Sequence, residues 1–209
     1  TFILAGCNST KNINQADDEG GIVIAASIFP LSDIAQNILG DSGVALTILP
    51  PGASPHTFEV RPSDIKSMSD ASLIFTVGHG LDSYVSKLGE NLSNAELVEV
   101  DDGIALRHFD HEEGEHGHHD HGDSDEEEEP QDPHYWLAMS NVEHIADNIE
   151  KSLSGKYPEK SSLFAKNKKT YLKEVEEIQK SLKQSILELE SVIDVEAESF
   201  NMNFVYADS

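Results

Sequence analysis

The sequence predicts an α/β fold that contains a parallel sheet and continues into one long helix. Four short apolar segments alternate with segments of helical spacing between residues 22 and 100. Alternating strands and helices are typical of a parallel sheet, since each parallel connection crosses over the sheet. After Pro158, apolar residues recur in steps of three and four along about 30 residues, which indicates a helix of roughly 45 Å. This apolar stripe consists of Tyr171, Val175, Ile178, Leu182, Ile186, Leu189 and Ile193.

The expected elements follow one another in a simple order. Residues 22–27 (IVIAAS) form a continuous apolar run, as expected of a strand that is buried on both faces. We expect further strands at Val44–Leu49, Ser72–Val77 and Leu97–Val100, and helices at Leu31–Leu39, Ser63–Met68 and Asp82–Leu88. A capping box at Ser140–Glu143 predicts another helix, which should end at Gly155.

The composition limits the size of the molecule and the classes of partner. The chain has 209 residues, which is enough for one large domain or two small ones. Its formal net charge of −25 opposes binding to phosphate backbones, so we expect no nucleic-acid partner. No apolar run is long enough for a membrane-spanning helix, and the single cysteine cannot form an intrachain disulfide.

Residues 1–21 are interpreted as the remnant of a signal peptide, a lipoprotein box and a flexible tether. The tetrapeptide Leu4–Cys7 (LAGC) resembles the bacterial lipoprotein signal box, and no initiator methionine precedes it, so we expect the sequence to be clipped upstream. The resemblance implies cleavage before Cys7 and attachment of lipid to its thiol and new amino terminus. Residues 8–21 are polar and end in two glycines, as expected of a tether. The alternative is an ordinary buried start with a free thiol.

Three histidines follow predicted strands. His56 lies in the loop after the second strand, His79 follows the third, and His134 comes after the fourth strand and the acidic segment beyond it. Ligands of parallel sheets bind at the carboxyl ends of the strands. Each histidine alone is as consistent with a hydrogen-bonded structural role as with a ligand. Their shared edge is what favours a metal site.

Residues 108–132 contain six of the ten histidines, twelve carboxylates and no Lys or Arg. Imidazole suits zinc, copper, nickel and iron, while carboxylates alone suit calcium and magnesium, so the mixture predicts an auxiliary segment that binds transition metals. Apart from Phe109 the segment lacks apolar residues, so we expect it to be disordered without metal. The alternatives are a solvated acidic loop and an expression tag, although a tag is expected at a terminus. The histidines are His108, His111, His116, His118, His119 and His121.

Three stretches resemble the metal-binding lipoproteins that deliver metal to ABC importers. The most specific is residues 50–64 (PPGASPHTFEVRPSD), and residues 28–31 (IFPL) and 132–137 (DPHYWL) fit the same family. The histidine-rich acidic segment is similar to that of the zinc members, since manganese members generally lack it. The resemblance implies that His56 and His134 are ligands of Zn²⁺. His79 is a candidate third ligand because it is expected at the same edge of the sheet.

The same family implies two α/β lobes joined by one long rigid helix, with the metal in the cleft between them. The first lobe would span residues 22–157 and the linking helix residues 158–195, while residues 196–209 would begin a second lobe that is mostly missing. Zinc members carry a third ligand histidine in the first strand of that lobe, where this sequence has Ala207. His79, Asp208, a loop histidine, water or a carboxylate of the second lobe could replace it, and the sequence leaves this open.

The resemblance also implies a role in zinc uptake. We expect an extracytoplasmic, lipid-anchored monomer that captures Zn²⁺ and delivers it to the membrane permease of a zinc ABC importer. An enzyme is not expected, because the H-E-x-x-H motif of zinc hydrolases does not occur. The alternative is a surface zinc buffer or metal-dependent adhesin that acts mainly through the histidine-rich segment.

Overall fold

The structure is a computed structural model that describes residues 21–89, 92, 94–108 and 131–199. In this part of the chain, parallel strands form one sheet in the order β2-β1-β3-β4. The strands are β1 (Ile22–Ala26), β2 (Gly43–Thr47), β3 (Leu73–Thr76) and β4 (Glu96–Glu99). The predicted α/β fold with a parallel sheet is therefore confirmed.

Helices connect the strands and continue beyond the sheet. The α-helices are α1 (Phe29–Leu39), α2 (Pro62–Ser67), α3 (Tyr84–Gly89), α4 (Val142–Lys156) and α5 (Ser161–Ser199). Short 3-10 helices are η1 (Gly40–Ser42), η2 (Pro133–Leu137), η3 (Met139–Asn141) and η4 (Pro158–Lys160). α1 begins before the predicted Leu31 because Pro30 lies in its first turn, where no backbone N–H is needed.

Both ends of α4 differ from the prediction. The capping box expected at Ser140–Glu143 is not formed, since Asn141 is the N-cap residue and its side chain makes no capping hydrogen bond. Asn141 Nδ2 instead donates to the carbonyl oxygen of Tyr135 at 3.0 Å. The reason is that η3 leads directly into α4, so Asn141 already has a helical conformation. Gly155 lies inside the helix, which ends at Lys156, so both predicted ends were wrong.

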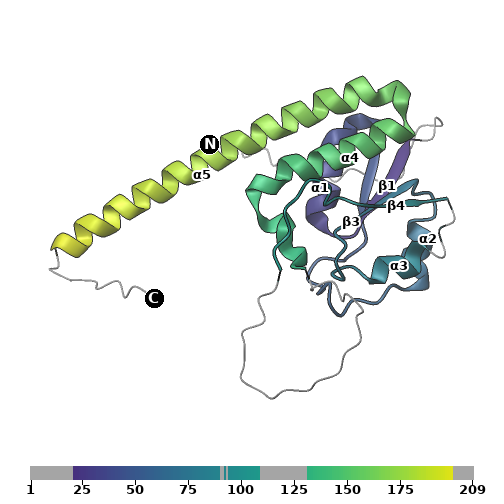
Figure 1. Cartoon of the computed structure of the whole chain (residues 1–209), viewed down its shortest axis with the longest axis horizontal. Helices are drawn as coiled ribbons and strands as arrows, with labels where there is room; N and C mark the ends of the chain where they lie inside the picture. Colours follow the sequence, from purple (N-terminus) through teal and green to yellow (C-terminus); the bar gives the residue numbers. More distant parts are fainter. Residues whose placement is uncertain (1–20, 90–91, 93, 109–130, 200–209) are drawn as a thin grey trace, which may run out of the picture.

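Helices cover both faces of the sheet (Figure 1). Ile24 of β1 and Phe75 of β3 belong to a core shared with α1, α4 and the start of α5, whereas Ala25 and Ile74 belong to a second core against α2 and α3. Neighbouring strand residues point to opposite faces, which is why the central strands β1 and β3 are apolar over nearly their whole length. Complete burial of a side chain such as Ile24 or Phe75 stabilises the fold by about 1.5–3 kcal/mol.

The helix α5 is packed at its start and exposed along its later part. Phe164 is fully buried, Asn167 Nδ2 donates to the carbonyl oxygen of Ile38 at 3.0 Å, and Lys168 Nζ lies 2.6 Å from Asp147 Oδ1. With 39 residues the helix is about 58 Å long and projects away from the sheet (Figure 1). The apolar side chains along its projecting part are exposed. They are Ile178, Leu182, Ile186 and Leu189.

Several predicted features lie outside the described residues. These are the lipoprotein box with Cys7, the tether up to residue 20, Ala207 and Asp208 with the strand expected around them, and five of the six loop histidines. Those five are His111, His116, His118, His119 and His121. Within the described part of the chain, no helix combines the length and the apolar character needed to cross a membrane.

Candidate metal site

His56 and His134 lie next to each other at the carboxyl edge of the sheet. Their ring centroids are 6.1 Å apart, and the ring planes are inclined by 50°. Two imidazoles that bind one zinc ion with Zn–N bonds of about 2.1 Å have centroids about 5–6 Å apart, depending on the angle at the metal. The two rings therefore already have nearly the separation that a shared ion requires. They are 78 residues apart in the chain, and the fold brings them together.

The loop that carries His56 is built from consecutive turns. The amide of Ala53 donates to the carbonyl oxygen of Pro50, and the amides of Thr57 and Phe58 donate to that of Ser54. Beyond these turns, the ring of Phe58 packs edge-on against Tyr84 of α3, with centroids 5.1 Å apart. This apolar contact anchors the loop on the core and leaves His56 exposed at its tip.

The Asp-Pro-His sequence orients the second histidine. Asp132 is the N-cap residue of η2, and Pro133 occupies the first turn, where its missing N–H costs nothing. Asp132 Oδ1 accepts hydrogen bonds from the amide of His134 at 3.0 Å and from its Nδ1 atom at 2.8 Å. An ionised carboxylate only accepts hydrogen bonds, so Nδ1 carries the proton and Nε2 keeps the lone pair that a metal needs.

The same contacts keep the carboxylate ionised. The backbone hydrogen bond from His134, followed by the hydrogen bond from its side chain, lowers the pKa of Asp132 below its ordinary value. A charged acceptor on Nδ1 makes the imidazole a stronger base and a stronger metal ligand. Asp132 is thus placed to support a metal ion that binds His134. Its position two residues before His134 is the signal that could have revealed this role in the sequence.

His79 occupies a different place from the histidine pair. It lies in a loop of three successive left-handed residues, with φ of 79° at Gly78, 49° at His79 and 80° at Gly80. Such a conformation costs a residue with a side chain on the order of 1–3 kcal/mol. Its Nε2 atom lies 2.9 Å from Asp101 Oδ2, and its ring meets Tyr135 edge-on at 6.3 Å between centroids.

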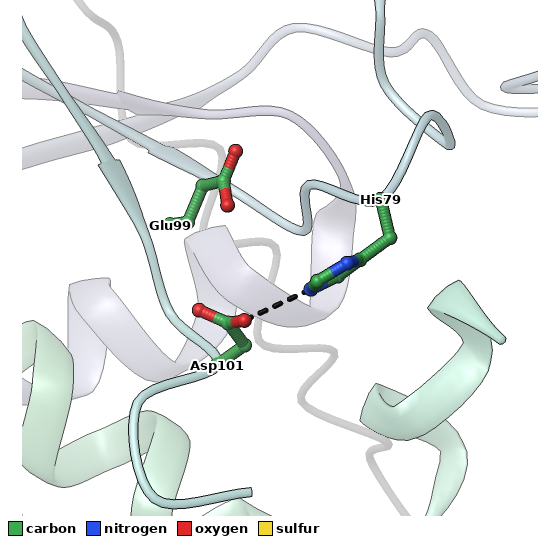
Figure 2. Close-up of side chains that lie close together, drawn as sticks. All are labelled: His79, Glu99 and Asp101. Atoms are coloured by element: carbon green, nitrogen blue, oxygen red, sulfur yellow. Dashed lines mark hydrogen bonds and ion pairs between the residues drawn. The ribbon is translucent and has the colours of Figure 1, made fainter. Parts of the chain in front are cut away.

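Among the described residues, His79, Glu99 and Asp101 form a group of side chains that could ligate a metal (Figure 2). One ligand atom of each lies within 4.8 Å of the others. His56 and His134 are not members of this group. The structure thus brings together two of the three predicted histidines and gives the third other neighbours, so a role for His79 as third ligand of the pair stays a prediction. The alternation Glu99-Val100-Asp101 at the end of a strand was the sequence signal for the two carboxylates.

The remaining described histidines lie outside both groups. His108 pairs with Gln131 through an antiparallel bridge, so the two ends of the histidine-rich segment meet. His144 is exposed on α4, and its ring packs over Gly103, where an added Cβ would be 3.3 Å from Nδ1. His144 is thus a surface residue that packs on a loop.

A parallel sheet with two histidines at its carboxyl edge and a long helix after it defines a metal-binding α/β protein. Residues 24–196 match the family described as zinc-uptake complex component A periplasmic, and the chain belongs to this family. The resemblance to the metal-binding lipoproteins of ABC importers is thereby confirmed.

Relatives that are named for binding manganese or zinc support this assignment. The manganese ABC transporter substrate-binding lipoprotein PsaA of Streptococcus mitis is 32% identical over 191 residues, which cover 87% of this chain and 56% of that protein. The zinc-binding protein AdcA of Streptococcus pyogenes is 28% identical over 170 residues, which cover 78% and 33%. The Mn-bound periplasmic metal binding protein from candidatus Liberibacter asiaticus superposes with a TM-score of 0.61 at 24% identity, over 82% and 57% of the two chains.

The chain spans about half the length of the curated relatives it matches. These relatives are binding proteins, in line with the prediction that the chain is not an enzyme. The relatives include manganese-binding and zinc-binding proteins, so membership of the family does not by itself assign the metal.

Proposed function

We propose that this chain carries the first metal-binding lobe of a lipoprotein that captures Zn²⁺ outside the cytoplasm and delivers it to the permease of an ABC importer. The observation that carries the proposal is the pair His56 and His134, whose rings lie 6.1 Å apart at the carboxyl edge of the sheet. Metal ligands at this edge come from loops, so they can be placed without disturbing the core.

The nature of the ligands favours zinc over manganese. Both side chains are imidazoles, which suit zinc, whereas manganese lies at the weak end of the divalent series and prefers oxygen ligands. The hydrogen bond to Asp132 occupies Nδ1 of His134 and leaves Nε2 available for a metal. Residues 108–132 would add weaker zinc sites, since ordering a polar segment around a metal costs conformational entropy.

The exposure of the pair suits capture and release. The side chain of His134 is 41% exposed, and His56 lies at a loop tip. Zinc takes four ligands, so the pair would fill two positions, and water or residues of a second lobe would fill the others. A metal held between two lobes is released when they separate, which is what hand-over to a permease requires.

The proposed anchor places the site at the membrane. Lipid on Cys7 would hold the protein at the outer face of the membrane, and the polar residues 8–21 would let the lobe reach the permease. Relatives such as PsaA are named as lipoproteins. Replacing Cys7 by Ser in the complete precursor should release the protein from membranes, and unchanged partitioning would contradict the anchor.

Metal titration of histidine variants tests the function. In calorimetry on the 209-residue chain, Zn²⁺ should occupy one site more tightly than Mn²⁺ does, and His56→Ala or His134→Ala should abolish that site. His144→Ala is the matched control, since it removes an exposed histidine of α4 whose ring packs over Gly103 and not against the pair. If His56→Ala leaves the number of tight Zn²⁺ sites unchanged, or if the site that it removes prefers Mn²⁺, the proposal is contradicted.

The alternative role as a surface buffer or adhesin has no support in the relatives compared. Deletion of residues 110–129 separates it from the carrier. A carrier would lose weak zinc sites and keep the tight one, whereas a buffer that acts through this segment would lose its zinc binding altogether.

A further inference from the structure

A second group of metal-ligating side chains lies at the carboxyl edge of the sheet. His79 comes from the loop after β3, Glu99 is the last residue of β4, and Asp101 follows it. One ligand atom of each lies within 4.8 Å of the others. Figure 2 shows the imidazole of His79 and the two carboxylates pointing toward a common space.

The register of the sheet explains why these residues meet. β3 and β4 pair in parallel with Thr76 opposite Glu99, so the residues that follow both strands emerge side by side. Glu99 and Asp101 are two positions apart, and in an extended chain such residues point to the same side. Gly78 leaves room for the first carboxylate, since an added Cβ would be only 2.7 Å from Glu99 Cδ.

The group carries excess negative charge. Within the described chain, neither Glu99 nor Asp101 forms an ion pair with a Lys or Arg, and the partner of Asp101 is His79 at 2.9 Å. A bound cation would offset this charge directly.

We propose that His79, Glu99 and Asp101 form a second binding site for a divalent transition-metal ion, separate from the pair of His56 and His134. One imidazole nitrogen and two carboxylate oxygens are ligands that such ions accept. Ligand atoms that share one ion at about 2.1 Å lie about 3–3.5 Å apart, so a group already within 4.8 Å needs only small side-chain rotations.

The existing hydrogen bond prepares the imidazole for this role. His79 Nε2 donates to Asp101 Oδ2 in the metal-free site, and this contact holds the ring against the carboxylates. When the ion binds Nε2, the proton moves to Nδ1 of the same ring or to solvent, and the lone pair of Nε2 forms the bond. The site uses residues of the first lobe alone, so it does not rest on the function proposed for the histidine pair.

Nuclear magnetic resonance of the histidine rings tests this site directly. Zn²⁺ is titrated into the ¹⁵N-labelled chain, and the ring nitrogens of His79 are identified by their loss in His79→Gln. We expect the Nε2 resonance of His79 to shift and saturate, and to do so equally in the double variant His56→Ala/His134→Ala.

The carboxylate contribution is tested with a matched pair of isosteric variants. Glu99→Gln should lower the Zn²⁺ affinity measured from the His79 resonance by about tenfold or more, which is the size of effect expected for a group that supports a metal. Glu96→Gln, at the other end of the same strand and also exposed, should leave it unchanged. Glu99→Gln keeps the contact between His79 and Asp101, so the loop stays folded. The proposal is overturned if His79 does not titrate, if its titration disappears with His56 and His134, or if Glu99→Gln and Glu96→Gln behave alike.

Discussion

Asp132 holds His134 by two hydrogen bonds from the same residue, one from the backbone amide at 3.0 Å and one from ring Nδ1 at 2.8 Å. This double contact fixes both the backbone and the ring of a proposed metal ligand. It also determines which ring nitrogen is protonated, so that Nε2 remains available beside His56. The strength of the proposed zinc site therefore depends on a carboxylate that does not itself belong to the pair.

We predict that Asp132→Asn weakens zinc binding at the histidine pair by about 10- to 100-fold, because an amide can accept at Nδ1 only as a neutral and less basic partner. Isothermal titration with Zn²⁺ measures the change. Asp102→Asn is the control, since Asp102 is an exposed aspartate that pairs with Lys151 outside the site. Equal affinities of the two variants would show that Asp132 is not needed.

The glycines on either side of His79, buried Gly78 and exposed Gly80, predict a graded series of stabilities. Gly78→Ala should destabilise the fold by about 1–2 kcal/mol for its φ of 79°, plus a smaller cost for displacing the flexible carboxylate of Glu99, whose Cδ would be 2.7 Å from the added Cβ. Gly80→Ala has a similar φ but no atom within 4 Å, so it should show the backbone cost alone.

Gly155→Ala completes this series with the opposite sign. Gly155 lies inside α4 with nothing near its added Cβ, so alanine should stabilise the protein by about 0.5–1 kcal/mol. Urea unfolding of the three variants measures the order. If Gly78→Ala and Gly80→Ala cost the same, Glu99 moves away from the added side chain without a measurable cost.

The ion-pair cluster between α4 and α5 predicts an alkaline loss of stability. Burial opposes the charge of Lys168, but hydrogen bonds to Asp147 and Glu150 outweigh it and raise its pKa. A raised pKa in the folded state means that the contribution is complete below the unfolded value of about 10.4 and is lost as pH rises through the folded value. Lys168→Met should cost on the order of 1 kcal/mol at pH 7, since the side chain of Asp147 is 52% exposed and solvent screens the pair.

The control for this prediction is the neighbouring lysine. Lys169 is exposed on α5, so Lys169→Met should change the free energy of unfolding little at any pH. Urea unfolding between pH 7 and 11 should bring the curves of wild type and Lys168→Met together at the alkaline end. A constant difference across this range would mean that Lys168 acts by packing instead of charge.

The two halves of α5 should respond differently to the loss of an apolar side chain. Phe164→Ala removes a fully buried ring and should cost about 3–5 kcal/mol. Leu182→Ala removes a side chain that is 57% exposed and should cost less than about 0.5 kcal/mol in this chain. Thermal or urea unfolding measures both. A large effect of Leu182→Ala would show that the projecting half of α5 is covered in solution.

The sequence by itself determined the kinds of element, their order and the edge of the sheet at which the proposed metal ligands lie. Continuous apolar runs such as residues 22–27 and the stripe after Pro158 depend on local periodicity, and local periodicity can be read without a structure. The placement of His56 and His134 on one edge followed from the same reasoning, because parallel strands all end at the same side.

Only the tertiary structure decided which side chains meet at that edge. His79 and Asp101 are 22 residues apart, and their contact depends on the register of β3 with β4 and on three left-handed residues in a row. Neither the register of these strands nor the left-handed backbone can be read from the periodicity of the sequence. The absence of a side-chain cap at the start of α4 was decided in the same way, by what its residues pack against. So was the burial of α5 at its start and the exposure of its later apolar side chains. Contacts between distant segments arise from packing and pairing of whole elements, so local patterns limit where they can form but do not choose the partners.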